Sequence, residues 1–268
     1  MSSHPPTLED LAQERISAGN IELPVFPSSA SEVLALCEEP EVDAKKLAEV
    51  IRRDASLAGH FLAIANSAAF GGRSQLVTLQ QALTRLGTTQ TKQIAVVIAC
   101  KTRAFVVPDR PARAEELLAH SFAAALFAQE IARARRLNVE EAFLAGLLHD
   151  IGKPAVLQTC GEIQRESGRA FDTSEIDACV GRFHEELGGV IAKSWQMRGP
   201  IVEAIAGHHT PSKKQTIAIV QLADELAHGR RDLATHHATD LLNLYPDDIE
   251  KLVARVAKLS GHDEKEAA

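Results

Sequence analysis

The sequence contains few aromatic residues, no excess of basic residues and no long apolar run. Phenylalanine, tryptophan and tyrosine make up 4% of its 268 residues, so few rings are available to stack on single-stranded nucleic acid. The formal net charge of −7 argues against the basic face of a general nucleic-acid binder. The longest apolar run, residues 94–100, is far too short to cross a bilayer. We therefore expect neither nucleic acid nor a membrane as a partner.

Cysteine is scarce as well. The sequence has no C-x-x-C pair, which argues against a zinc knuckle, and the wide spacing favours reduced thiols over disulfides. The first residues show neither the charged nor the apolar region of a secretory signal. These features indicate a cytoplasmic protein with 45% hydrophobic and 24% charged residues, which is ordinary for a globular chain. The cysteines are Cys37, Cys100, Cys160 and Cys179.

Helix signals run along the whole chain and predict an all-α fold. Asp43, Asp54 and Thr78 each precede a segment with apolar residues at helical spacing, and we expect each to cap a helix. Residues 94–100 are β-branched enough for a strand, but the neighbouring segments are all helical in pattern, so we expect a buried helix. Further helices are expected over residues 113–136, 140–150, 175–195, 200–209, 216–228 and 246–256.

Residues 107–111 mark an internal boundary, because two prolines and two charged residues make a poor helix interior. Two stretches are predicted to be irregular: residues 158–173 as a loop with a short helix, and residues 229–240 as a polar linker. The chain then divides into a loose tail or weak first helix at 1–20, an N-terminal helical half at 21–107, a second helical half at 112–228, and a C-terminal helical extension at 229–268.

The chain is organised around residues 142–154, where an apolar helix runs into adjacent His149 and Asp150. Gly152 and Pro154 are expected to end this helix, because glycine tolerates the turn and proline cannot continue a helix. An imidazole and a carboxylate at the buried end of an apolar helix are costly unless something pairs with them. Both are ligands for divalent metals, so a metal ion is the expected partner.

Other segments place histidines and carboxylates on or beside apolar stripes. Adjacent helical residues point roughly 100° apart, so neighbouring histidines can serve one cluster only at a helix end, and Pro211 provides such an end. A carboxylate on an apolar face needs a cation or donors. The candidate ligands are Glu116 and His120 in one helix, His184 in a second, His208 and His209 in a third, and Asp224 in a fourth.

A histidine cluster without metal is the structural alternative, because a single inward histidine is more often a hydrogen-bonded core residue than a ligand. The joint occurrence on separate helices favours metal binding. The remaining histidines are interpreted as solvated or packing residues: His4, His60, His228, His236, His237 and His262.

These motifs resemble a known family. The order His120, His149-Asp150, Asp224 and the string at residues 146–153 resemble the HD superfamily of metal-dependent phosphohydrolases. The segments at residues 23–27, 50–57 with 65–68, and 81–87 look like the HDOD family of bacterial signalling domains. The resemblance implies an N-terminal helical bundle packed on an HD-like helical half that carries the metal site.

The resemblance also implies roles for individual residues. His120, His149, Asp150 and Asp224 would form the basic HD ligand set. The additional ligands of the related HD-GYP phosphodiesterases would correspond to His184, His208 and His209, with Asp150 bridging two ions, Glu116 as a further ligand and Lys153 facing a phosphate. Iron, manganese or zinc suits this donor set. The Gly-Tyr-Pro segment that names the HD-GYP enzymes is missing after His209, which argues against cyclic-di-GMP hydrolysis.

Two functions follow from the resemblance. The first is a signalling output or adaptor module with a retained metal site, whose partners would be a histidine kinase, a response regulator or a cyclic-di-GMP enzyme. The second is a metal-dependent phosphohydrolase or phosphodiesterase for a nucleotide or other phosphoester, with Asp150 and Lys153 as catalytic residues. The sequence shows no fused receiver domain, so we expect the input to come from another protein or a small ligand.

Overall fold

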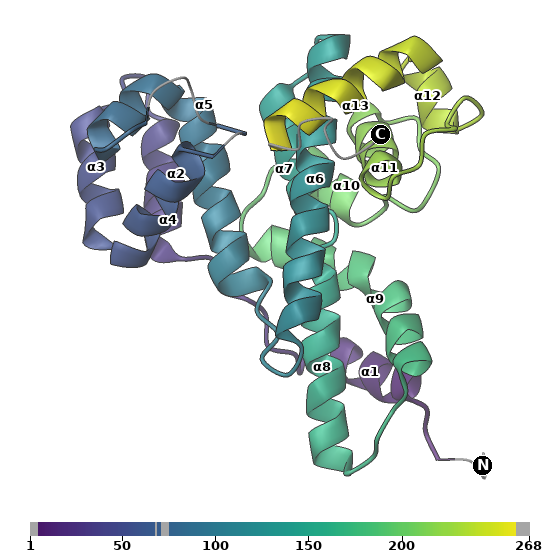
Figure 1. The fold of residues 1–268 in the computed structure, drawn as a ribbon. Coiled ribbons are helices and arrows are strands. Elements are labelled where there is room, and N and C mark those ends of the chain that lie inside the picture. The colour runs from purple at the N-terminus through teal and green to yellow at the C-terminus, as the bar shows by residue number, and fades with distance from the viewer. Residues whose placement is uncertain (1–4, 68, 71–74, 261–268) are drawn as a thin grey trace.

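The computed structural model describes residues 5–67, 69–70 and 75–260, and every regular element in this part of the chain is a helix (Figure 1). This confirms the predicted all-α fold. No helix in the described ranges is both long enough and apolar enough to span a membrane.

The N-terminal bundle stands to one side of the molecule (Figure 1). Asp43, Asp54 and Thr78 cap three of its helices as expected, each accepting a hydrogen bond from a backbone N–H of the first turn. Residues 94–100 lie in a buried helical stretch, which confirms the helical interpretation. The bundle consists of α2 (Ser28–Cys37), α3 (Ala44–Arg53), α4 (Ala55–Ala65), α5 (Leu79–Ala99) and the π-helical turn η1 (Cys100–Ala104).

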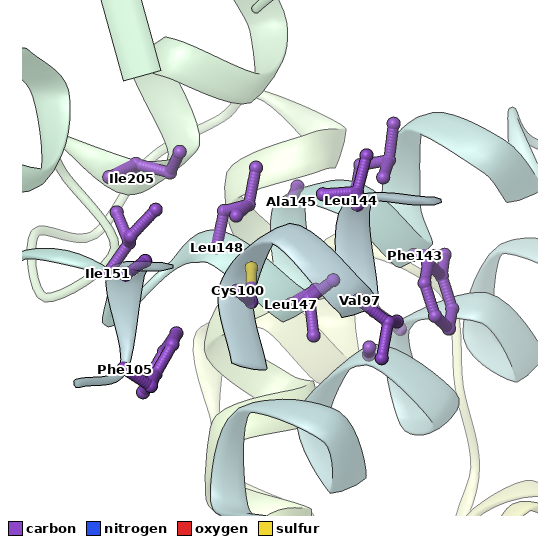
Figure 2. Packing of buried hydrophobic residues seen from close by; sticks show 14 of the residues in the cluster. Val97, Cys100, Phe105, Phe143, Leu144, Ala145, Leu147, Leu148, Ile151 and Ile205 are labelled. Atoms are coloured by element: carbon purple, nitrogen blue, oxygen red, sulfur yellow. The ribbon is translucent and has the colours of Figure 1, made fainter. Parts of the chain in front are cut away.

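The HD-like half is built around α6 (Pro111–Arg135), which packs against α7 (Val139–Leu148) and α11 (Gln215–Ala227). The contact between the two halves runs from α5 to α7. Val97 and Cys100 at the end of α5 face the apolar residues Leu147 and Leu148 of α7 in a continuous core (Figure 2). The remaining helices of this half are α8 (Gly152–Ser167), α9 (Thr173–Ser194) and α10 (Gly199–Ile205).

The prediction of a loop at residues 158–173 is wrong, because α8 continues to Ser167. The apolar helix that leads into His149 and Asp150 ends before Gly152 as expected, since α7 stops at Leu148. A new helix, α8, then begins at once at Gly152. Pro154 is compatible with this start, because the first N–H groups of a helix have no intrahelical partner. The polar residue Thr159 is buried and donates its hydroxyl to the Ala155 carbonyl at 2.9 Å, so the polarity of the segment does not indicate exposure.

Residues before the N-terminal bundle form a capped helix, α1 (Leu8–Ser17), which is the helical alternative predicted for the first part of the chain. Thr7 and Asp10 form a capping box, and Leu8 is buried. The helix packs on α8 and α9, far from the bundle that follows it in the chain (Figure 1). An extended segment then crosses back, and the Trp195 indole donates to the Pro24 carbonyl at 2.8 Å.

The C-terminal extension covers the HD-like half. Within the expected linker at 229–240, α12 (His237–Leu241) begins. The last helix, α13 (Pro246–Ser260), packs on α6. Arg255 of this helix approaches Glu130 of α6, whose side chain is buried, with Nε and Oε2 3.2 Å apart. His4 and His262 lie outside the described residues.

Helices α8 and α9 approach closely where α8 begins. A Cβ atom built on Gly152 would lie 2.0 Å from the His184 carbonyl oxygen and 2.7 Å from the Gly188 nitrogen. Gly188 and Gly189 of α9 in turn admit Ile205 and Ala206 at the end of α10. This contact brings the end of α7, the middle of α9 and the end of α10 to one place.

We expect Gly152→Ala to destabilise the metal-free protein by about 3 kcal/mol or more, because the methyl group meets backbone atoms that cannot move aside. The control is Gly59→Ala in α4, where a Cβ meets nothing within 4 Å and alanine should stabilise by roughly 0.5–1 kcal/mol. Urea unfolding followed by far-UV circular dichroism measures both. A wild-type midpoint for Gly152→Ala would contradict the packing described.

Candidate metal centre

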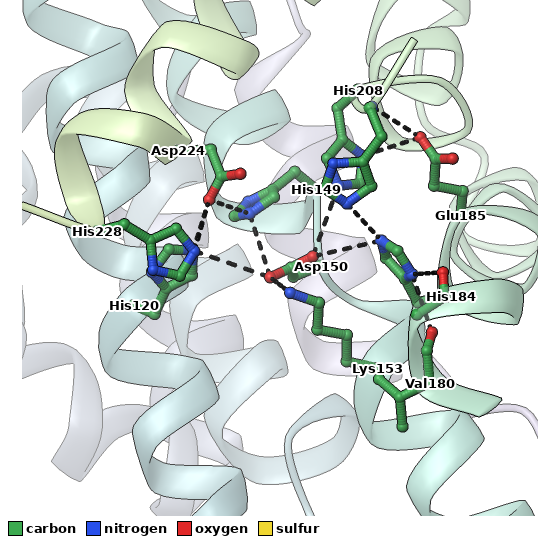
Figure 3. A network of polar contacts seen from close by, with 12 residues as sticks. His120, His149, Asp150, Lys153, Val180, His184, Glu185, His208, Asp224 and His228 are labelled. Carbon is green, nitrogen blue, oxygen red and sulfur yellow. Dashed lines mark hydrogen bonds and ion pairs between the residues drawn. The ribbon is translucent and has the colours of Figure 1, made fainter. Parts of the chain in front are cut away.

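The centre of the site is the break between α7 and α8. His149 follows the last residue of α7, Asp150 comes next, and both side chains are 0% exposed. The chain turns through hydrogen bonds from the Ile151 N–H to the Leu148 carbonyl and from the Lys153 N–H to the Asp150 carbonyl. This turn points the Asp150 carboxylate inward, between two groups of histidines (Figure 3).

The two oxygens of Asp150 face different groups. Oδ2 lies 3.2 Å from His149 Nε2, 3.8 Å from His120 Nε2 and 2.5 Å from Lys153 Nζ. On the other side, Oδ1 lies 3.6 Å from His208 Nε2 and 3.9 Å from His184 Nε2. One carboxylate therefore stands between two sets of nitrogen donors.

The first group, which we call the open subsite, contains His120, Asp224 and His228 next to His149. Asp224 Oδ1 lies 2.9 Å from His120 Nε2, 3.5 Å from His149 Nε2 and 3.4 Å from His228 Nε2. The donors come from α6, the end of α7 and the end of α11. Three segments distant in sequence thus converge, and Asp150 belongs to the same segment as His149.

The second group, the closed subsite, contains His184, His208 and His209. His184 Nε2 and His209 Nε2 are 3.0 Å apart. The two adjacent histidines lie in the turn after α10, which lets both face one cluster as the sequence argument required. Glu185 supports this turn, since its Oε1 accepts the His209 backbone N–H at 3.0 Å and lies 3.6 Å from His208 Nδ1.

Backbone carbonyls fix the orientation of three imidazoles. Nδ1 of His149 donates to the Gly146 carbonyl at 2.7 Å, Nδ1 of His184 to the Val180 carbonyl at 2.9 Å, and Nδ1 of His208 to the Ile205 carbonyl at 3.0 Å. A carbonyl only accepts, so Nδ1 carries the proton. In the neutral ring the lone pair is then on Nε2, the atom that faces Asp150 in each case.

Several polar atoms at the centre have no hydrogen-bond partner among the described residues, whereas Asp150 Oδ2 is paired with the Lys153 ammonium at 2.5 Å. The atoms without a partner are His149 Nε2, His208 Nε2 and Asp150 Oδ1. A buried polar group without a partner costs about 1–3 kcal/mol, and more when it is charged. Imidazole Nε2 lone pairs and carboxylate oxygens are the donors that divalent transition metals take. The residues present therefore fit a metal ion on each side of Asp150.

Electrostatics in the site follow from burial and from the two carboxylates. Burial lowers the pKa of His149, but the nearby negative charges of Asp150 and Asp224 outweigh it and raise this pKa to about 10. Burial alone would raise the pKa of Asp150, yet the surrounding cations hold it well below its usual range. Burial lowers the pKa of His184 to about 4 and also lowers that of His209, so both rings are neutral at pH 7 and available as ligands.

The structure brings together all the predicted ligands except Glu116. The Glu116 side chain is exposed and lies 3.7 Å from Arg113 on the same helix, outside the cluster. The sequence analysis missed Glu185, which follows His184, and His228, which it interpreted as a solvated or packing residue. The spacing of Asp224 and His228, one helical turn apart, was the available signal.

A cavity of about 390 Å³ opens beside the open subsite. Its wall includes His120, Lys153 and His228. Apolar side chains of α6, α8 and α9 line another part, and Arg113, Glu116 and Asp177 provide charges. The closed subsite does not line this cavity. A small charged molecule could therefore reach the metal centre from one side.

We expect the wild-type protein to bind about two Zn²⁺ or Mn²⁺ ions and Asp150→Ala to lose them, because Asp150 faces both subsites. At one hundred times its Kd a metal stabilises the fold by about 2.7 kcal/mol, a rise in Tm of roughly 5–10 °C for a chain of this size. Elemental analysis and thermal unfolding measure these effects. Asp177→Ala, at an exposed carboxylate of the cavity, is the control. Equal shifts in Asp150→Ala and wild type would contradict the assignment.

Sequence comparison places the chain among HD-type proteins. A model of the HDOD domain matches residues 23–211. Ribonuclease Y of Mycoplasma mycoides subsp. mycoides SC is 32% identical over 145 residues, which cover 53% of this chain and 24% of that protein. The chain covers 24% of the length of this ribonuclease and 38% of the length of a relative from Treponema pallidum.

Two solved structures share the fold over nearly the whole chain. A protein from Shewanella amazonensis SB2B, proposed to be a metal-dependent phosphohydrolase, has a TM-score of 0.75 at 20% identity and covers 93% of this chain and 95% of its own. An HDOD domain protein of unknown function from Geobacter sulfurreducens has a TM-score of 0.69 at 23% identity, with 96% and 97% covered. Because the family model matches well over half of the residues, the chain belongs to the HDOD domain family.

Proposed function

We propose that this HDOD protein holds two divalent metal ions across Asp150 and uses them to hydrolyse a phosphoester. The observation that carries the proposal is the set of buried, unpartnered donor atoms on His149, Asp150 and His208, next to a cavity lined by Lys153. Structural histidines would be expected to satisfy each other by hydrogen bonds. Here the inward-facing nitrogens of His149 and His208 remain unsatisfied while their outward nitrogens are bonded.

Each ion would have its own donors. The open subsite offers His120, His149 and Asp224 together with Asp150 Oδ2. The closed subsite offers three histidine nitrogens together with Asp150 Oδ1: His184, His208 and His209. Mixed imidazole and carboxylate donors suit iron, manganese or zinc.

The ions, when bound, supply positive charge and lower the pKa of water in the site toward neutrality. Asp150 would hold an ion on each side, and its lowered pKa makes it a weak proton acceptor, so we assign it to metal binding. The Lys153 side chain is 21% exposed and stands between Asp150 and the cavity. Its ammonium group can contact a phosphate oxygen that enters from the cavity.

The relatives support a phosphoester as the bond attacked, since ribonucleases cleave phosphodiesters. We favour a nucleotide or another small phosphoester over an RNA chain for this protein. The cavity has the volume of a small-molecule site, and the net charge of −7 does not favour a long anionic polymer. A cytoplasmic location is part of the same proposal and is consistent with four free, buried cysteines.

We expect Lys153→Ala to keep its metal ions but to lower kcat by about 10²–10³-fold, because a cation facing the phosphate is removed while every ligand stays. Metal-loaded protein would be assayed with p-nitrophenyl phosphate and bis(p-nitrophenyl) phosphate. Lys193→Ala, at an exposed position on α9, should retain full activity. The absence of turnover from wild type loaded with each of Mn²⁺, Fe²⁺ and Zn²⁺ would contradict the hydrolase proposal.

A signalling adaptor is the second candidate, with a histidine kinase, a response regulator or a cyclic-di-GMP enzyme as partner. Membership of the HDOD family supports it. The described part of the N-terminal bundle contains no cluster of potential metal ligands, and Val77 at its surface is 70% exposed. These features suit a module that binds a protein rather than one that performs chemistry.

For an adaptor we expect Asp150→Ala to capture the same partner protein as wild type, in the same amount, because the mutation lies in the other half. Affinity purification from cells with both chains, followed by mass spectrometry, measures this. Partner loss in the folded variant would place the metal centre within the binding surface.

A further inference from the structure

We propose that His228 is a further metal ligand of the open subsite, on the side that faces the cavity. The inference rests on the proposed metal centre and adds a residue that the family resemblance did not supply. His228 lies one helical turn after Asp224, at the end of α11, so both side chains leave the helix on one face. Its Nε2 reaches to 3.4 Å from Asp224 Oδ1.

The distances in the open subsite match the edges of a coordination shell. Two donor atoms that bind one ion through bonds of about 2.0–2.2 Å lie no more than about 4.4 Å apart, which is twice the bond length. His228 Nε2 and Asp224 Oδ1 are 3.4 Å apart, and His149 Nε2 lies 3.5 Å from the same oxygen. His149 Nε2 and Asp150 Oδ2 are 3.2 Å apart.

A hydrogen bond does not account for the position of His228. Its contact with Asp224 at 3.4 Å is longer than the 2.9 Å contact between His120 and the same carboxylate oxygen. The His228 ring lies 4.3 Å from the His120 ring between centroids, tilted by 32°, which brings the donor nitrogens of both toward Asp224. The donor atoms of His120, Asp224 and His228 all lie within 4.8 Å of one another, as those of the closed subsite do.

His228 is the exposed donor of the open subsite. Its side chain is 55% exposed and lines the cavity, whereas those of His149, His184 and His208 are at most 2% exposed. An exposed ligand can leave more easily than a buried one, because its nitrogen can return to water without a desolvation cost. His228 is therefore the ligand that an incoming phosphoester would displace.

Imidazole ¹⁵N NMR of the metal-free protein during titration with Zn²⁺ tests the proposal. The His228 signals are assigned from their loss in His228→Ala. We expect the His228 Nε2 resonance to shift in the same titration step as that of His120. Calorimetry should show that His228→Ala raises the Kd of one of the two Zn²⁺ ions by about tenfold or more. His60→Ala, in α4 of the N-terminal bundle, should bind both ions as wild type does.

The outcomes separate this inference from the metal centre itself. Shifts at His120 and His149 with no shift at His228 would overturn the ligand role and leave the metal centre standing. A His228 shift that occurs only after inorganic phosphate is added would also overturn it, and would make the residue a substrate contact. No shift at any of these rings would overturn the proposed function as well. Far-UV circular dichroism confirms that His228→Ala is folded before its affinity is compared.

Discussion

A fully buried carboxylate, Asp150, is the constraint on which the rest of the structure depends. An ionised group without water must be surrounded by positive charge or by donors. The chain meets this need by ending α7 just before Asp150 and by directing histidines of α6, α9 and the turn after α10, together with a lysine of α8, toward it (Figure 3). Gly152 belongs to the same arrangement. Helix α9 carries His184, and its backbone lies so close to the start of α8 that a side chain at position 152 would collide with it.

Helix ends also fix the orientation of two of the donor histidines. The last carbonyls of a helix have no intrahelical partner. Gly146 and Ile205 offer such carbonyls, and a histidine three residues later takes each one with its Nδ1. One local arrangement, used at the ends of α7 and α10, therefore determines which nitrogen of His149 and His208 faces the centre. The chemistry of the site depends on where these helices stop.

The sequence predicts where helices lie better than it predicts what their side chains face. Asp43, Asp54 and Thr78 were found because capping acts within four residues. The grouping of the side chains from His120 to Asp224 could be predicted because several of them stand on apolar stripes and their order resembles that of the HD superfamily. Glu116 was misplaced, because helical spacing defines a face but not where the neighbouring helices end. The sequence did not single out His228, because this residue lies on no apolar stripe. Its position in the structure is given by its contact with the Asp224 carboxylate. The second part of the helix at 152–167 was missed because the segment from residue 158 onward is polar and contains glycine, and local composition does not reveal that α1 and α9 pack on α8.

The position of α1 affects the order in which the chain can fold. This helix is made before the surface that it covers, since its ion pairs join Arg15 to Glu162 and Glu166, about 150 residues later in the chain. Contacts of such separation form late, because closing a long loop costs entropy before any contact is gained. During synthesis the bundle of α2 to α5 can fold while α1 still lacks the surface that it covers. Helix α1 is thus made before its partners α8 and α9 and reaches its place only after them, and its docking completes the HD-like half.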